Sequence, residues 1–189
     1  MYATGRRVLV AALMLLAAGA VAAAGADEIR RDELAAAQTW GGVDNVVGVR
    51  NLYFSAQPDL AALQAARQHG VGVVINLREP GETDWDEQQA ATDLGLAYYN
   101  VPISRSGPGF VSADLDRISA LVADNSDTRI LLHCSSGNRA AAWFATHLAR
   151  DHGMAAADAI ELAEKAGMTS DGLKQRVTDY LAGTAGTEK

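Results

Sequence analysis

The residues best suited to chemistry lie together at positions 132–139, which read Leu-His-Cys-Ser-Ser-Gly-Asn-Arg. Cys134 is the only cysteine among the 189 residues, so the chain can form neither an internal disulfide nor a zinc site made of cysteines alone. A thiolate is a strong nucleophile, and Arg139, five positions later, carries a permanent positive charge. The pair predicts covalent chemistry on an anionic group.

The residues between the cysteine and the arginine are small or polar: Ser135, Ser136, Gly137 and Asn138. Residues of this size let the backbone curl so that several N–H groups point at one spot, which suits a bound phosphate. A helix is expected directly afterwards, and the partial positive charge at its N-terminus would favour both an anion and the thiolate form of Cys134. We expect these four residues to bind phosphate and Arg139 to fold back over the loop.

A second interpretation of the loop is structural. A lone cysteine beside an apolar strand can pack as a small buried hydrophobe, and the ring of His133 can support nearby backbone. The other histidines do not predict a metal site, because His147 and His152 lie five apart on a predicted helix, a spacing that does not place both on one metal. Neither a metal nor a cofactor is expected.

Hydrophobic periodicity divides the rest of the chain into alternating strands and helices. Short β-branched runs predict strands at 45–49, 52–55, 71–77, 96–103 and 129–133. Helical patterns occur between them at 60–69, 85–94 and 112–123, and three more follow the loop at 140–151, 155–166 and 170–181. This order predicts a single α/β domain, with a central, mostly parallel sheet of about four or five strands flanked by helices and a helical C-terminal half.

The predicted strand at 129–133 explains where the chemistry would occur. Its sequence is the most apolar of the five, which is typical of a central strand buried on both faces. Ligands of open parallel sheets bind at the carboxyl ends of the strands. Because Cys134 follows this strand directly, we expect it at that edge, in the middle of the sheet.

The first 26 residues have the pattern of an export signal. Arg6 and Arg7 precede an uncharged run at 8–26, whose end reads Ala-Gly-Ala before the first acidic residue, Asp27. An uncleaved anchor helix is the alternative, but the second half of the run is mostly alanine and glycine, which hold a helix weakly in lipid. We expect residues 1–26 to be a signal peptide, the product to be periplasmic or secreted, and residues 27–42 to form a loose lead-in.

The charge of the chain limits its partners. The 16 Lys+Arg and 23 Asp+Glu give a net charge of -7. Loss of residues 1–26 removes two arginines and no acid, which makes the net charge -9. Nucleic acids and anionic membrane surfaces bind basic faces, so neither is expected as a partner. Any affinity for anions must therefore be local.

The loop resembles the active site of the cysteine-dependent phosphatases, which reads His-Cys-x-x-Gly-x-x-Arg. The chain is more closely similar to a bacterial phosphatase-like family that also occurs attached to beta-lactamase-like hydrolases and is related to atypical dual-specificity phosphatases. The resemblance is carried by 51–58, 70–78 with Glu82, 95–102 and 133–139. It implies that residues 43–182 form a dual-specificity-phosphatase-like catalytic domain acting on a phosphorylated protein or a small phosphomonoester through a Cys134 thiophosphate, and that residues 183–189 form a disordered tail.

The sequence departs from the phosphatase pattern in three places. Four residues instead of five separate Cys134 from Arg139, and Ala140 stands where many phosphatases have a Ser or Thr. The segment 104–112, expected to carry the general acid, has no Asp or Glu. The remaining candidates for the acid are Asp84, Asp86 and Asp114, each of which could equally cap a helix or face its dipole.

Two other functions fit the same loop. The four-residue spacing resembles rhodanese-type sulfurtransferases, in which the cysteine carries a persulfide and no acid is required. A non-catalytic domain that senses anions or redox state would also use an exposed thiol with no second cysteine to resolve it. Arg78 and Arg105 are expected in loops on the same face, either contacting substrate or in solvated or ion-paired positions.

Overall fold

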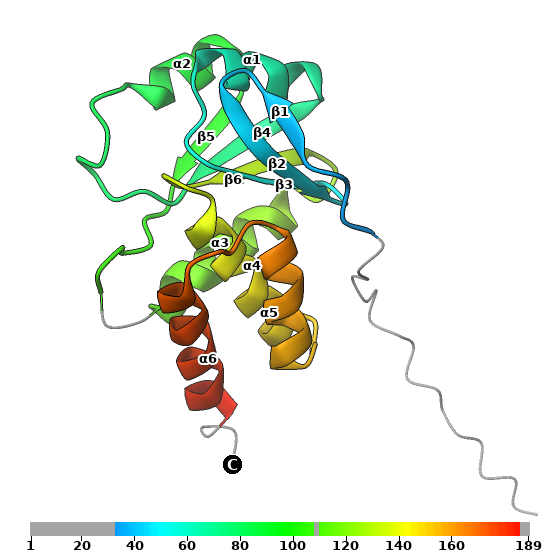
Figure 1. Cartoon of the computed structure of the whole chain (residues 1–189). Coiled ribbons are helices and arrows are strands. Elements are labelled where there is room, and N and C mark those ends of the chain that lie inside the picture. Colours follow the sequence, from blue (N-terminus) through cyan, green and yellow to red (C-terminus); the bar gives the residue numbers. More distant parts are fainter. Residues whose placement is uncertain (1–32, 108–109, 186–189) are drawn as a thin grey trace, which may run out of the picture.

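A computed structural model describes residues 33–107 and 110–185. The predicted signal peptide at 1–26 lies outside the described residues, as do residues 186–189 of the predicted tail. The described chain is one α/β unit built on a six-stranded sheet (Figure 1). Its strands are β1 (Gln38–Trp40), β2 (Val43–Val49), β3 (Leu52–Ser55), β4 (Val71–Asn76), β5 (Ala97–Asn100) and β6 (Arg129–His133).

The sheet has the order β1-β2-β3-β6-β4-β5. β3, β6, β4 and β5 are parallel neighbours, whereas β1 and β2 add antiparallel strands at one edge. The predicted α/β class with a mostly parallel sheet is confirmed, with six strands instead of four or five. The additional strand, β1, lies in the segment 27–42 that was expected to be loose, because Trp40, only 2% exposed, anchors it in the core.

Within the described residues, six helices cover the two faces of the sheet unequally (Figure 1). α1 (Leu60–Gln68) and α2 (Glu87–Asp93) lie on one face. The other face carries α3 (Ser112–Asp124), α4 (Asn138–Asp151), α5 (Ala156–Lys165) and α6 (Asp171–Ala185). α6 continues three residues past the predicted domain end at 182, so the tail expected from 183 begins as helix. No described helix is long and apolar enough to cross a membrane.

Alternating side chains of the central strands supply both hydrophobic cores. Ile130 and Leu132 of β6 pack in the larger core with α3 to α6, and Leu131 packs in the smaller core with α1. This alternation follows from the period of two in a strand, which requires apolar residues throughout when both faces are covered. β6 lies between β3 and β4, so the prediction that this strand is central is confirmed. Its carboxyl end delivers Cys134 to the middle of the sheet edge.

Candidate active site

The loop from β6 to α4 turns at Gly137. Gly137 has φ 85°, in the left-handed region that favours glycine, and it is the N-cap of α4 without a side-chain hydrogen bond to the helix. A Cβ at this position would lie 3.4 Å from the carbonyl carbon and oxygen of Ser55 on β3, which is a tight contact. The turn therefore directs the first N–H groups of a 14-residue helix at the end of the loop, where an anion is stabilised.

Arg139 folds back beneath this turn and is only 3% exposed. Its Nη1 donates to Glu82 Oε1 at 2.6 Å and its Nη2 donates to Glu82 Oε2 at 2.7 Å. Nη1 also donates to the carbonyls of Leu77 (3.2 Å) and Ile103 (2.9 Å), and Nη2 lies 3.3 Å from the hydroxyl of Ser135. Arg139 was expected over the loop, but in this structure its guanidinium is held by Glu82 and contacts the loop only at Ser135.

The ion pair sets the charge state of both groups. The hydrogen bond from Arg139 lowers the pKa of Glu82 to about 2, although burial of the carboxylate opposes this change. Burial would lower the pKa of Arg139, but the hydrogen bond with Glu82 and the electrostatic interaction with Cys134 outweigh it and raise the pKa. Glu82 is therefore ionised at neutral pH and holds no proton to donate, and Arg139 lies within electrostatic reach of the cysteine.

Cys134 is buried at the base of the loop, with 1% of its surface exposed. It belongs to the larger hydrophobic core, as the structural interpretation of a lone cysteine anticipates. Its neighbours above it, Ser135 and Arg139, line an open pocket, whereas Cys134 itself does not. The thiol is therefore not exposed to this pocket in the structure.

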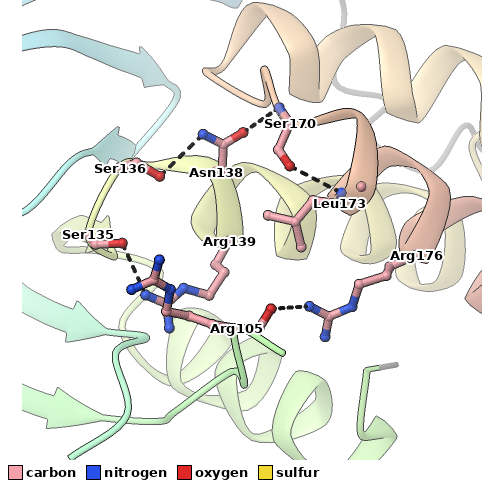
Figure 2. A pocket seen from close by; sticks show the side chains of 9 residues that line it. Arg105, Ser135, Ser136, Asn138, Arg139, Ser170, Leu173 and Arg176 are labelled. Atoms are coloured by element: carbon pink, nitrogen blue, oxygen red, sulfur yellow. Dashed lines mark hydrogen bonds between the residues drawn. The ribbon is translucent and has the colours of Figure 1, made fainter. Parts of the chain in front are cut away.

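The pocket above the loop has a volume of about 340 Å³ and is lined by arginine and small polar residues (Figure 2). The loop contributes Ser135, Ser136, Asn138 and Arg139. The remaining lining residues are Arg105, Ser170, Gly172, Leu173 and Arg176. None of the described residues that line it is acidic. Of the predicted loop residues, the structure brings all but Cys134 and Gly137 to the pocket wall.

Arg176 and Ser170 are lining residues that the sequence did not indicate. They lie 37 and 31 residues after Arg139, on and just before α6, a segment that the sequence marks only as helical. Contacts of Asn138 explain why the start of α6 lies close to the loop between β6 and α4. Its Oδ1 accepts hydrogen bonds from the backbone N–H groups of Thr169 (2.7 Å) and Ser170 (2.8 Å), which fixes the start of α6 beside the loop.

A buried polar cluster supports the strand side of the loop. His133 is fully buried, and its Nε2 lies 2.8 Å from Oε1 of the buried Glu87, at an angle that does not form a hydrogen bond. Asn76 donates to Glu87 Oε2 (3.1 Å) and to the hydroxyl of Tyr98 (2.8 Å). Burial raises the pKa of Tyr98 to about 12, so it remains a neutral phenol. The expected bond from the His133 ring to nearby backbone is not observed, because the ring faces the Glu87 side chain and neither ring nitrogen has a hydrogen-bond partner.

The three candidate acids lie away from the pocket. Asp86 caps α2 by accepting from the N–H of Gln89 at 3.0 Å, and Asp84 is exposed. Asp114, in the first turn of α3, lines a different cavity. Arg78 also faces elsewhere: it is 8% exposed, bonds to Gln57 and the Glu82 carbonyl, and its Nε lies 3.5 Å from Glu82 Oε2.

His147 and His152 lie close together at the C-terminal end of α4. The Nε2 atoms of His147 and His152 lie 3.2 Å apart, because His152 is the C-cap of α4 and leaves the helical path on which their spacing was counted. Asp151 contacts the Nδ1 of His147 at 2.6 Å. Among the described residues, no group of three or more His, Cys, Asp or Glu side chains could hold a metal ion.

Comparison with known proteins relates the fold to solved structures. No protein-family model matches the sequence, and no curated protein matches it. Kinase associated phosphatase aligns with a TM-score of 0.62 at 13% identity, covering 71% of this chain and 87% of that one. The chain has the fold of the cysteine-dependent phosphatases. The resemblance inferred from the loop and the flanking segments is thus confirmed for the fold.

Two bacterial structures agree with this result. A candidate phosphatase (DUF442) from Shewanella putrefaciens CN-32 aligns with a TM-score of 0.58 at 20% identity, over 82% of this chain and 92% of its own. TpbA of P. aeruginosa aligns with a TM-score of 0.58 at 18% identity, over 78% and 89%. At such identities the likeness describes the fold, and the chemistry must be argued from the loop itself.

Proposed function

We propose that this protein is a cysteine-dependent phosphatase that hydrolyses phosphomonoesters through a Cys134 thiophosphate. One arrangement carries the proposal. The lone cysteine directly follows the central strand, α4 begins four residues beyond it, and Arg139 folds back within electrostatic reach of the thiol. A nucleophile and two sources of positive charge thus meet at one point, which is what an in-line attack on a phosphate dianion requires.

In the proposed reaction the thiolate of Cys134 attacks phosphorus, an S–P bond forms and the P–O bond to the leaving group breaks. The backbone N–H groups of 135–138 and the guanidinium of Arg139 stabilise the charge on the equatorial oxygens. Water then attacks phosphorus, the S–P bond breaks, and inorganic phosphate and the thiolate are released. Both donor atoms of Arg139 contact Glu82 in this structure, so Arg139 turns from Glu82 toward the loop to grip phosphate.

The leaving oxygen receives its proton from water in this proposal. No Asp or Glu is among the described residues that line the pocket, and Glu82, with a pKa of about 2, is ionised. Loss of general-acid catalysis costs about 10²- to 10⁴-fold in rate. Aryl phosphates, whose leaving groups need little protonation, are therefore expected to react much faster than alkyl phosphates.

Hydrolysis of p-nitrophenyl phosphate by the protein from Asp27 onward tests the mechanism. Cys134→Ser should abolish phosphate release, and Arg139→Lys should nearly do so, because lysine cannot make the two-point contact. Ser119→Ala, which removes a hydroxyl of α3 that bonds to His147 and Asp151 in the C-terminal part of α4, serves as a control that leaves the loop residues unchanged. Wild-type activity in Cys134→Ser would exclude the covalent intermediate.

A second measurement addresses the burial of the thiol. If Cys134 is reached through the pocket, iodoacetamide should alkylate it slowly, and inorganic phosphate should slow the alkylation further in a concentration-dependent manner. Protection that is unaffected by Arg139→Lys would mean that phosphate binds somewhere other than at the loop.

A sulfurtransferase is the second candidate, favoured by two observations. Four residues separate Cys134 from Arg139, and the described pocket wall provides no acid, which persulfide chemistry does not need. Thiosulfate and cyanide would then yield thiocyanate, with sulfur carried as a Cys134 persulfide. Thiocyanate formation without phosphate release would replace the phosphatase proposal, whereas inactivity in both assays would favour an anion- or redox-sensing domain.

We also propose that the protein is exported to the periplasm or secreted. The pattern at 1–26 supports this: a basic start, an uncharged run and a small-residue end before Asp27. Expression of the full chain in a bacterium, followed by N-terminal sequencing of the protein from the periplasmic fraction, tests it. A mature product that begins near Asp27 is expected, and an intact N-terminus in the cytoplasmic fraction would contradict the proposal.

A further inference from the structure

Two imidazole rings meet at the C-terminal end of α4, at the opposite end of the helix from the candidate active-site loop. The Nε2 atoms of His147 and His152 lie 3.2 Å apart, and the two rings are inclined at 80° to each other. Two ligands that each lie about 2.05 Å from one metal ion are separated by about 2.9 Å at a right angle and about 3.3 Å at the tetrahedral angle. The two nitrogens therefore have the spacing of neighbouring ligands on one transition metal.

The end of the helix brings His152 to His147. Two residues five apart on a regular helix point in directions about 140° apart, so their spacing alone does not indicate a shared ligand. His152 is instead the C-cap of α4, with φ −114° and ψ 0°, and Gly153 follows in the left-handed region at φ 68°. The N–H of Met154 donates to the carbonyl of Leu148 at 3.1 Å, which fixes this turn against the helix.

The other nitrogen of the His147 ring is held by Asp151 and Ser119. Nδ1 lies 2.6 Å from Asp151 Oδ2 and 3.0 Å from Ser119 Oγ, and the same hydroxyl donates to Asp151 at 2.8 Å. An ionised carboxylate only accepts, so Nδ1 carries the ring proton and Nε2 keeps a lone pair that faces His152. Burial lowers the pKa of His147, which keeps the ring neutral at pH 7. Histidines that bind metals are usually oriented in this way by a carboxylate.

The surroundings of the pair favour a cation. The last carbonyl groups of the 14-residue helix α4 carry its partial negative charge, and His152 lies at that end. The exposed Asp151 adds a full negative charge, whereas the charge of Arg150 is offset by its ion pair with Asp116 of α3. The His147 side chain is 12% exposed and His152 is half-buried, so an ion can reach both rings from solvent.

We propose that His147 and His152 bind one divalent transition-metal ion through their Nε2 atoms, with Asp151 orienting the His147 ring and water completing the coordination. The ion replaces the contact between the two rings, and His152 then carries its proton at Nδ1. Imidazole ligands suit Cu²⁺, Ni²⁺ and Zn²⁺ better than Mg²⁺ or Ca²⁺, and Cu²⁺ binds most tightly. The inference is independent of the proposed phosphatase function, because the site lies at the other end of α4.

Tryptophan fluorescence reports binding at this site. The indole of Trp143 stacks on the His147 ring at 4.8 Å and 17°, and a Cu²⁺ ion quenches the fluorescence of a nearby indole. Cu²⁺ is titrated into the protein without a histidine tag, in a Cys134→Ser background that excludes binding to the thiol. One equivalent should quench part of the emission. Trp40, which stacks on the lone His69 at 4.7 Å, should be quenched only at higher Cu²⁺ concentrations.

Substitution of each histidine tests the assignment of the ligands. Loss of a partner that orients a metal ligand costs about 10- to 100-fold in metal affinity, so loss of a ligand should cost at least ten-fold. His147→Gln and His152→Gln should each weaken Cu²⁺ binding by that amount, whereas the matched control His69→Gln should bind as the parent protein does. Electron paramagnetic resonance should show two nitrogen ligands on Cu²⁺, and one in His152→Gln. Equal affinity in His152→Gln and the parent, or a single nitrogen in the parent, would overturn the site.

Zn²⁺ tests the effect of the ion on the fold, in the same Cys134→Ser background. An ion that binds only the folded chain raises the midpoint of urea unfolding. Zn²⁺ should raise this midpoint in the parent protein and in His69→Gln, but not in His152→Gln, whose substitution lies in the turn and remains informative if His147→Gln does not fold. A rise of the same size in His152→Gln would place the ion elsewhere and contradict the proposal.

Discussion

Glu82 and Arg139 form a two-point ion pair beneath the candidate active-site loop, with N–O distances of 2.6 and 2.7 Å. The residues are 57 positions apart, and the Glu82 side chain is 11% exposed. Arg139 is, with Cys134, one of the two expected catalytic residues. The ion pair therefore affects both the stability of the fold and the position of Arg139 at the candidate site.

Glu82→Gln should destabilise the protein by about 3 kcal/mol at pH 7, because it leaves the buried guanidinium of Arg139 without its counter-charge. Urea unfolding measures this difference. Glu164→Gln, which breaks the exposed pair with Lys174, is the matched control and should cost no more than about 1 kcal/mol. Similar losses of stability in the two variants would mean that the buried Glu82–Arg139 pair stabilises the fold no more than an exposed ion pair does.

The difference in the free energy of unfolding between the wild type and Glu82→Gln should become smaller at low pH. The pKa of Glu82 is about 2 in the fold against a reference value of 4.5, so its contribution is fully present above pH 4.5. Acidification from pH 4.5 toward pH 2 protonates Glu82 in the unfolded chain first, and the advantage of wild type over Glu82→Gln should shrink. A difference that is the same at pH 3 and pH 7 would contradict this assignment.

Gly137→Ala should lower both stability and phosphatase activity. The substitution places a Cβ at φ 85° and 3.4 Å from the Ser55 carbonyl group, so a strained backbone conformation is combined with a close contact to β3. Gly81→Ala is the matched control, because Gly81 has the same φ of 85° with nothing within 4 Å of its Cβ position. Backbone strain alone should cost Gly81→Ala about 1–2 kcal/mol, and Gly137→Ala should lose more. Equal losses, with activity retained in both, would show that the approach to β3 is unimportant.

Asn138→Ala should free the start of α6. The variant removes the acceptor for the N–H groups of Thr169 and Ser170, so these amides should exchange with deuterium faster, and stability should fall by about 1–3 kcal/mol. Asn138→Asp keeps an oxygen at the same place and should preserve slow exchange. Unchanged exchange in Asn138→Ala would place the anchor of α6 elsewhere.

His147 should make the fold less stable below neutral pH. Burial lowers its pKa, as does the charge of His152, and Asp151 only partly opposes them. The unfolded chain therefore binds a proton near pH 6.5 that the fold resists, and stability declines as the pH falls from about 7 through this range. In His147→Gln, the midpoint of urea unfolding should depend less on pH between pH 8 and pH 5 than it does in the wild type. A variant that keeps the wild-type slope would assign the dependence to another group.

The local features of the site could be predicted from the sequence because they depend on neighbouring residues. The apolar run of β6, the small residues at 135–138 and the helix after them predict a strand, a tight turn and an anion-facing helix end. Both cores also follow from alternating apolar residues. β1 was missed because three residues carry little periodicity, and pairing with β2 together with the burial of Trp40 decides its structure.

Contacts between distant segments were decided only by the tertiary structure. Glu82 meets Arg139, Arg176 of α6 reaches the pocket, and Asp84, Asp86 and Asp114 do not line it. Local periodicity shows which face of a helix is apolar, but not where a neighbouring element places its ends. The sequence by itself determined that a cysteine and a loop of small residues follow the central strand. Packing of α6 and of the loop after β4 decided which charges surround them, since those positions depend on the sum of many contacts across the domain.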